Sequence, residues 1–333
     1  MSAADVSLYS FSVAAIVVLF VILESTEWGL SIVIPYLTKH AGDRRVLARI
    51  LRPGFKGTEL CLLAAVYMMM HVFPDYSALH GDALWGGCAL VLFSLLSRAV
   101  LAWGCHGDVP LARGLARVNA FLGAAAIAGA NWLMLTFLIE ISVGALPPTM
   151  WFWGPLAGLS ALWAVSALSV QGAYIVAART ENPLAERARA LALVLTVPTV
   201  ALYVLLFMAA CMVWNIPGEI ALSVVLGLIP AVLYGASFVA TRRRHVITGG
   251  WLHYAAIILG LFEFLFTLWN VLTEFAVGSA IVQYALPQPV IWSVVLGTVL
   301  TIAAKIWRWR QPRERVATGY EWDTLRTRQR GGK

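Results

Sequence analysis

The chain has 333 residues, of which 60% are hydrophobic and only 12% are charged, and its mean hydropathy is +0.80. An ordinary soluble domain carries about a quarter charged residues, so this composition excludes a soluble globular protein and indicates an integral membrane protein. The net charge of +7 does not indicate nucleic acid binding, because the basic residues lie in alternating loops and in the C-terminal tail. Such a distribution is what the positive-inside rule expects of a membrane protein.

Apolar runs of about 20 residues, separated by short polar loops, predict an all-α fold of about nine transmembrane helices. The alternation of basic and uncharged loops places the N-terminus outside and the C-terminus in the cytoplasm. The first residues lack the basic region and cleavage site of a signal peptide, so the first helix is expected to be retained. We expect the spans near residues 8–36, 57–73, 82–103, 118–143, 152–178, 190–213, 218–240, 253–277 and 289–309.

These helices are expected to form two four-helix bundles and one peripheral helix. Residues 1–150 would make the N-terminal half, residues 151–310 the C-terminal half with the final helix, and residues 311–333 a basic cytoplasmic tail. The stretch 40–55 is cationic and amphipathic, which predicts a short segment lying along the cytoplasmic membrane face. A topology signal that meets lipid headgroups explains this stretch equally well.

The first apolar stretch, 19–37, carries two acids at membrane depth. Glu24, Glu27, Ser31 and Pro35 are spaced by three and four residues, so a helix places them along one side. A charge in the bilayer centre costs roughly 2.5–3.5 kcal/mol even on lenient scales, so this polar stripe should face protein or trapped water. Two interpretations remain open: an interhelical hydrogen-bond anchor, and a proton path or cofactor-side acid pair.

Further charges lie near this stripe in the expected fold. Lys56 and Glu59 share one face at the start of the second span, where Lys56 either pairs with an acid or extends to the interface. Arg98 lies about one turn inside the third span. It is expected to hold an acid or a cofactor propionate, or to reach the interface.

Two secondary candidates lie elsewhere. Glu263, between Phe262 and Phe264, should be either protonated or paired. His71 is a weak candidate for a haem ligand, because no two histidines share a helix face with ligand spacing. The 4 cysteines form no CxxC pair, and no zinc or phosphate-binding motif is present. The sequence thus offers no self-contained active site, which suggests a subunit whose partner carries the reactive centre.

Three motifs occur in a fixed order along the chain. The acids of the first span precede Gly29 and Pro35; Asp43-Arg44-Arg45 precedes the segment at 53–62; and Gln171-Gly172-Ala173-Tyr174 precedes Arg179-Thr180. In order and spacing they resemble subunit II of cytochrome bd-type quinol oxidases over roughly the first 190 residues, whereas the last third resembles it poorly. The positions that match the family, and that it implies to be structural, are Gly29, Pro35, Pro53, Gly57, Arg98, Gln171, Gly172, Arg179 and Thr180.

The resemblance implies a heterodimer with a haem-bearing subunit I in a bacterial or archaeal cytoplasmic (inner) membrane. Haems b and d and the quinol site are then expected in the partner, and none of the haems is ligated by this chain. The chain would stabilise subunit I, possess no catalytic residue of its own and bind no metal. In some members subunit II lines a proton path to the oxygen-reducing haem. A structural quinone, bound lipid and a small single-helix accessory subunit are further expectations. The complex would oxidise quinol and reduce oxygen to water.

One position departs from the family pattern. Lys56 stands where the family has the acid usually assigned to the proton path. Either protons enter elsewhere, or Lys56 neutralises Glu24, Glu27 or Glu59 in a buried charge cluster; we favour the second. A proton-coupled secondary transporter and a purely structural assembly subunit remain as alternatives for the whole chain.

Overall fold

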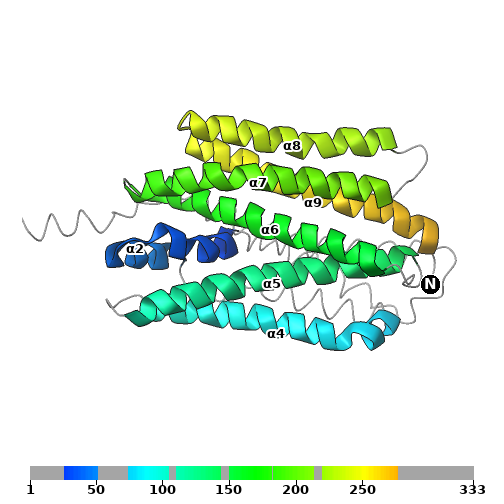
Figure 1. Cartoon of the computed structure of the whole chain (residues 1–333), viewed down its shortest axis with the longest axis horizontal. Coiled ribbons are helices and arrows are strands. Elements are labelled where there is room, and N and C mark those ends of the chain that lie inside the picture. The colour runs from blue at the N-terminus through cyan, green and yellow to red at the C-terminus, as the bar shows by residue number, and fades with distance from the viewer. Residues whose placement is uncertain are drawn as a thin grey trace, which may run out of the picture.

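The computed structural model describes residues 26–51, 74–104, 110–143, 150–181, 183–213 and 220–276, and all regular structure in these ranges is helical. The predicted all-α fold is therefore confirmed for them. The long helices lie side by side with similar axis directions, and a short helix lies near one end (Figure 1). After a helix at residues 26–37, the elements are α2 (Ala41–Leu51), α4 (Pro74–Gly104), α5 (Pro110–Val143), α6 (Met150–Arg179), α7 (Leu184–Val213), α8 (Ile220–Arg242) and α9 (Val246–Ala276).

Several helices begin earlier than the apolar runs predict. α5 begins at Pro110 rather than near 118, α7 at Leu184 rather than near 190, and α9 at Val246 rather than near 253. The added turns of α5 and α7 carry arginines, because a helix continues past the hydrocarbon region while its long basic side chains reach water. The added turns of α9, residues 246–252, carry no charged side chain. The predicted spans 57–73 and 289–309 lie outside the described residues. The total of nine, the orientation and the division into two bundles therefore stay predictions.

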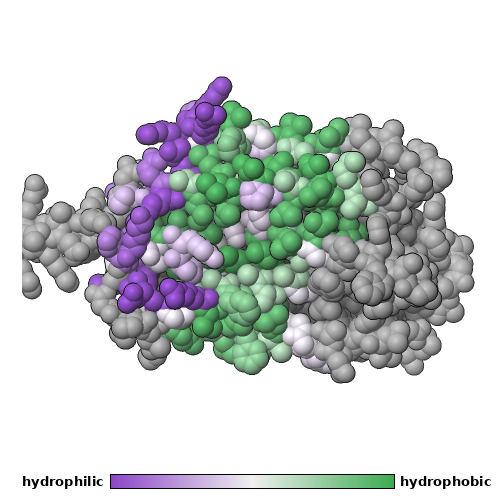
Figure 2. Space-filling view, viewed as in Figure 1, coloured by the Kyte–Doolittle hydropathy of each residue, from purple (hydrophilic) through white to green (hydrophobic). Residues whose placement is uncertain are grey.

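The surface separates into a hydrophilic end and an apolar band. Hydrophilic side chains gather at the end that carries α2, and hydrophobic ones cover the described middle of the molecule (Figure 2). Large apolar side chains such as Phe121, 72% exposed, and Val194, 67% exposed, face outward in this band. Within the described ranges, Gly158–Arg179 and Leu184–Ala209 are long and apolar enough to cross a membrane. We call the hydrophilic end the basic end; its exposed arginines include Arg45, Arg117, Arg242, Arg243 and Arg244.

The 26–37 helix crosses α6 with its backbone in direct contact. A Cβ at Gly29 would collide with the Leu168 carbonyl, and one at Gly172 would collide with the backbone of Gly29 and Leu30. Only glycine permits such an approach, which is a common way for membrane helices to pack. These two glycines, matched to the family by sequence, therefore fix the position of the first helix on α6.

The amphipathic segment predicted at 40–55 is confirmed in its described part as α2. The apolar face of α2 is covered by protein, because Val46, Leu47 and Leu51 are buried. They join a core cluster that includes Leu37 from the 26–37 helix and Leu184 from α7. α2 is thus docked at the basic end by the same hydrophobic contacts that hold the long helices.

Candidate functional site

The first part of the candidate site is a buried ion pair between the 26–37 helix and α4. Arg98 Nη1 lies 3.4 Å from Glu27 Oε2, and the two side chains are 7% and 14% exposed. At 1.5 Å per residue, Arg98 is about 9 Å from the C-terminal end of α4, and Glu27 is about 15 Å from the C-terminal end of the 26–37 helix. Both charges therefore lie within the helices. Among the alternatives for Arg98, the structure shows the one in which it holds an acid.

A third helix, α5, adds polar contacts beside this pair. Asn119 Nδ2 donates to the Ser31 carbonyl at 3.4 Å, and Ser97 Oγ lies 3.1 Å from Asn119 Oδ1. Ser31 Oγ in turn donates to the Trp28 carbonyl at 2.8 Å. A Cβ at Gly123 of α5 would lie only 2.9 Å from Ser31 Oγ, so this glycine lets α5 approach the polar stripe. The described part of that stripe faces protein, as the sequence predicted.

Several predicted site residues cannot be placed beside the pair. Glu263 belongs to α9, but its side chain is not described. For Glu27 the structure supplies Arg98 as a cationic partner. The pairing of Lys56 with an acid stays a prediction, and so does any role of Glu24 or Glu59. The predicted positions outside the described residues are Glu24, Pro53, Lys56, Gly57, Glu59 and His71.

The remaining family-matching positions lie on the first helix and at the end of α6. Pro35 is half-buried in the last turn of the 26–37 helix, and Gln171 is buried beside the helix crossing. Arg179 is the last residue of α6. Thr180 ends the helix by donating from its backbone N and its Oγ1 to the Val176 carbonyl, at 3.0 and 2.7 Å.

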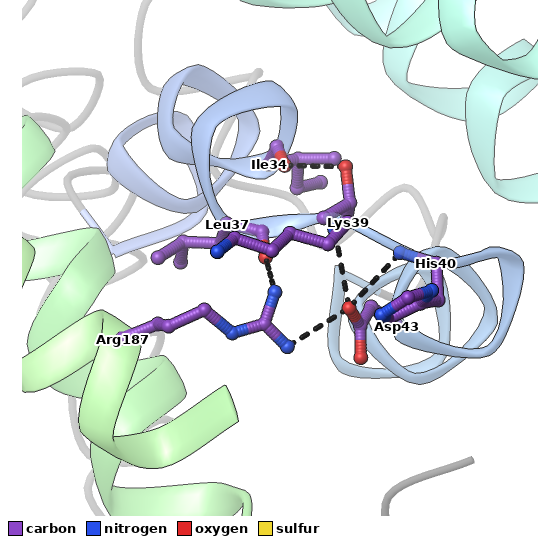
Figure 3. A network of polar contacts seen from close by, with 7 residues as sticks. Ile34, Leu37, Lys39, His40, Asp43 and Arg187 are labelled. Atoms are coloured by element: carbon purple, nitrogen blue, oxygen red, sulfur yellow. Dashed lines mark hydrogen bonds and ion pairs between the residues drawn. The ribbon is translucent and has the colours of Figure 1, made fainter. Parts of the chain in front are cut away.

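A second polar feature fastens α2 at the basic end. Arg187 of α7 donates from Nη1 to the Leu37 carbonyl at 2.6 Å and from Nη2 to Asp43 Oδ2 at 2.9 Å (Figure 3). The same Asp43 oxygen accepts from the backbone N of Lys39 at 3.1 Å and of His40 at 3.2 Å. These bonds satisfy amides at the start of α2 that have no partner within the helix. Because Asp43 is only 2% exposed, Arg187 is the cation that balances a buried carboxylate.

Sequence reasoning did not pair Asp43 with Arg187. Asp43 was noted only as part of the Asp43-Arg44-Arg45 motif, and 144 residues separate it from Arg187 in the chain. An acid in the first turn of an amphipathic helix was the one available signal in the sequence. It indicates a cap but does not identify the cation.

A third polar feature lies among α6, α8 and α9. Tyr174 OH lies 2.9 Å from Ser237 Oγ and 2.7 Å from Thr241 Oγ1, and all three residues are buried. Nearby, His253 is fully buried, with Nε2 3.0 Å from the Ala167 carbonyl. The sequence interpretation of His253 as the start of a helix was wrong. α9 begins at Val246, which carries His253 two turns inward.

The described residues contain no group of three or more His, Cys, Asp or Glu side chains that could hold a metal ion. What these residues do contain is a set of polar contacts between helices. Each of the three features joins side chains from at least two helices that are distant in sequence.

The family profile of cytochrome bd terminal oxidase subunit II matches residues 7–311. The chain belongs to this family. The structure of bd oxidase from Geobacillus thermodenitrificans is similar, with a TM-score of 0.64 and 14% sequence identity. The match covers 91% of this chain and 96% of that chain, and at this identity it shows a shared fold. No curated protein matches the chain.

Membership confirms the resemblance first read from about 190 residues and extends it to residue 311, across the weakly matching last third. The chain is therefore a subunit of a membrane-integral cytochrome bd oxidase, a quinol oxidase complex in which subunit I is its partner. The apolar surface band agrees with that environment (Figure 2). The buried ion pair, the α2 attachment and the His253 group are then features of a respiratory membrane subunit.

Proposed function

We propose that the chain is the subunit that ligates no haem in a complex that oxidises quinol and reduces oxygen in a bacterial or archaeal cytoplasmic membrane. Its role there is to stabilise subunit I, in which haems b and d and the quinol site are expected. The observation that supports a structural role best is the Glu27–Arg98 pair, 3.4 Å apart and joining two helices. A structural quinone and a single-helix accessory subunit belong to the same proposal.

Within this role, Glu27 acts as a fixed counter-charge. A guanidinium is charged at all accessible pH values, so Arg98 stabilises Glu27 as a carboxylate. A proton relay must take up and release a proton in every turnover, and a permanent cation beside the acid opposes the uptake. The pair therefore suits the interhelical anchor that the sequence left open.

A proton path along the same helices is the second candidate. It is favoured by the polar atoms of Ser31, Ser97 and Asn119 beside the pair, which could guide a proton past a fixed charge. In that case Glu24 and Glu59 would carry the protonatable steps. The two roles make different predictions for the same variants.

The test compares Glu27→Gln, Arg98→Gln and the double variant in the complex purified through this chain. Removing one partner of a buried pair leaves the other charge uncompensated, which costs about 3–5 kcal/mol, whereas removing both is often close to neutral. A fixed pair therefore predicts low haem content and low yield in each single variant and recovery in the double. A relay predicts normal haem content but slow oxygen consumption in Glu27→Gln.

Glu186→Gln is the matched control. Glu186 Oε2 lies 2.7 Å from Arg189 Nη2, but the Glu186 side chain is 41% exposed. Exposed pairs contribute about 0–1 kcal/mol, so haem content should stay normal in this variant. Normal haem content in both buried single variants, or a double variant no better than the worse single one, would contradict the fixed-pair role.

A further inference from the structure

Three helices of the C-terminal part, α6, α8 and α9, enclose an aromatic group around His253. The His253 ring lies 5.0 Å from the ring of Tyr234 in α8 and 5.6 Å from that of Tyr174 in α6, measured between centroids. Trp163 of α6 completes the group beside Tyr203, 6.0 Å away. His253 and Tyr234 are 0% exposed and Trp163 is 2% exposed, so no bulk solvent reaches them.

Three polar atoms of this group have no hydrogen-bond partner in the described part of the chain: His253 Nδ1, the Tyr234 hydroxyl and Trp163 Nε1. The Trp163 indole lies beside the Tyr234 hydroxyl, but the two groups do not meet the geometry of a hydrogen bond. The Ala167 carbonyl can only accept, so His253 Nε2 carries the proton and Nδ1 of the neutral ring is an acceptor. The group therefore offers one acceptor, one donor and one hydroxyl that can do both.

We propose that α6, α8 and α9 bind an internal water molecule at His253. The water accepts hydrogen bonds from the Tyr234 hydroxyl and the Trp163 indole and donates one to His253 Nδ1. Buried waters typically make about three hydrogen bonds to otherwise unpaired polar groups, which is what this donor and acceptor set supplies. Gly260 of α9 lets the rings of Tyr203 and Trp163 pack close to its backbone, since a Cβ there would lie 3.1 Å from Tyr203 and 3.6 Å from Trp163.

The neighbouring hydroxyls show why the water belongs at His253. Tyr174 OH bonds the hydroxyls of Ser237 and Thr241, Ser237 Oγ donates to the Gly249 carbonyl at 2.7 Å, and Thr241 Oγ1 donates to the Ser237 carbonyl at 2.8 Å. These groups need no further partner. The water at His253 would continue this polar core one step further from the basic end and would hold α9 against both α6 and α8.

Tyr234→Phe tests the proposal through the sign of its effect on the melting temperature of the purified complex. If the hydroxyl bonds a water, its loss removes one of the partners of that water, and the Tm should fall by about 2 °C or more. If the hydroxyl is buried without a partner, phenylalanine removes a desolvated polar group at constant shape, and the Tm should stay or rise. Tyr203→Phe is the control, because Tyr203 OH bonds the Gly227 carbonyl directly at 3.1 Å and its loss lowers the Tm in either case.

His253→Gln is the second variant. A glutamine amide keeps a donor for the Ala167 carbonyl but has no acceptor at the position of Nδ1. If one water joins Nδ1 to the Tyr234 hydroxyl, the double variant loses less than the sum of the two single effects. A Tyr234→Phe complex that melts at or above the wild-type temperature, or full additivity in the double variant, overturns the proposal. The readout is thermal stability, so it is independent of the proposed role of Glu27.

Discussion

Gly172→Ala should force apart two helices whose backbones are in contact. The new methyl group would overlap the Gly29 carbonyl carbon and the Leu30 nitrogen, which are main-chain atoms and cannot turn aside as a side chain can. Overpacking typically costs about 1–3 kcal/mol, and a backbone clash belongs at the upper end of that range. Alanine regains about 1 kcal/mol in helix propensity. The net loss should be about 2 kcal/mol.

The assay is thermal melting of the complex purified through this chain, with haem content as a second measurement. Gly235→Ala in α8 is the matched control, because a Cβ there meets nothing within 4 Å and only the propensity gain remains. We expect Gly172→Ala to lower the Tm and Gly235→Ala to leave it unchanged or slightly higher. Equal melting temperatures for the two variants would refute the close crossing and, with it, the placement of Glu27 beside α4.

Two further substitutions probe the basic end. Arg187→Lys should weaken the attachment of α2 by about 1–2 kcal/mol, because an ammonium lacks the fork that reaches both the Leu37 carbonyl and Asp43. Proteolysis within residues 38–40 by a broad-specificity protease should then speed up, and a wild-type rate would count against the role of Arg187. Arg244→Gly should raise the Tm, because Arg244 has a φ of 67°, a left-handed conformation that costs a non-glycine residue roughly 1–2 kcal/mol. Arg243→Gly is its control, and a fall in Tm for Arg244→Gly would mean that the side chain contributes more than the strain costs.

The helical architecture followed from the sequence because hydropathy is a property of a continuous segment. A bilayer leaves helices as the simplest way to satisfy the backbone, so apolar runs already identify most described helices. Their ends were harder to predict. The two turns that place His253 inside α9 come shortly after the three arginines at 242–244 and contain Thr248, Gly249 and Gly250, so the prediction began the helix after them. The same reasoning correctly marked 40–55 as amphipathic, but could not say that Leu47 and Leu51 are buried against other helices.

By itself the sequence determined the class of protein, its membrane environment, its family and the residues that need a partner, such as Glu27 and Arg98. Only the tertiary structure decided which groups are those partners. Burying a charge or polar atom without a partner costs free energy at any position, so the sequence alone shows which residues need a partner. The identity of each partner depends on which helix faces pack against each other. Here that is decided by contacts between distant segments: Gly29 against Gly172, Asp43 against Arg187, and His253 against the Ala167 carbonyl.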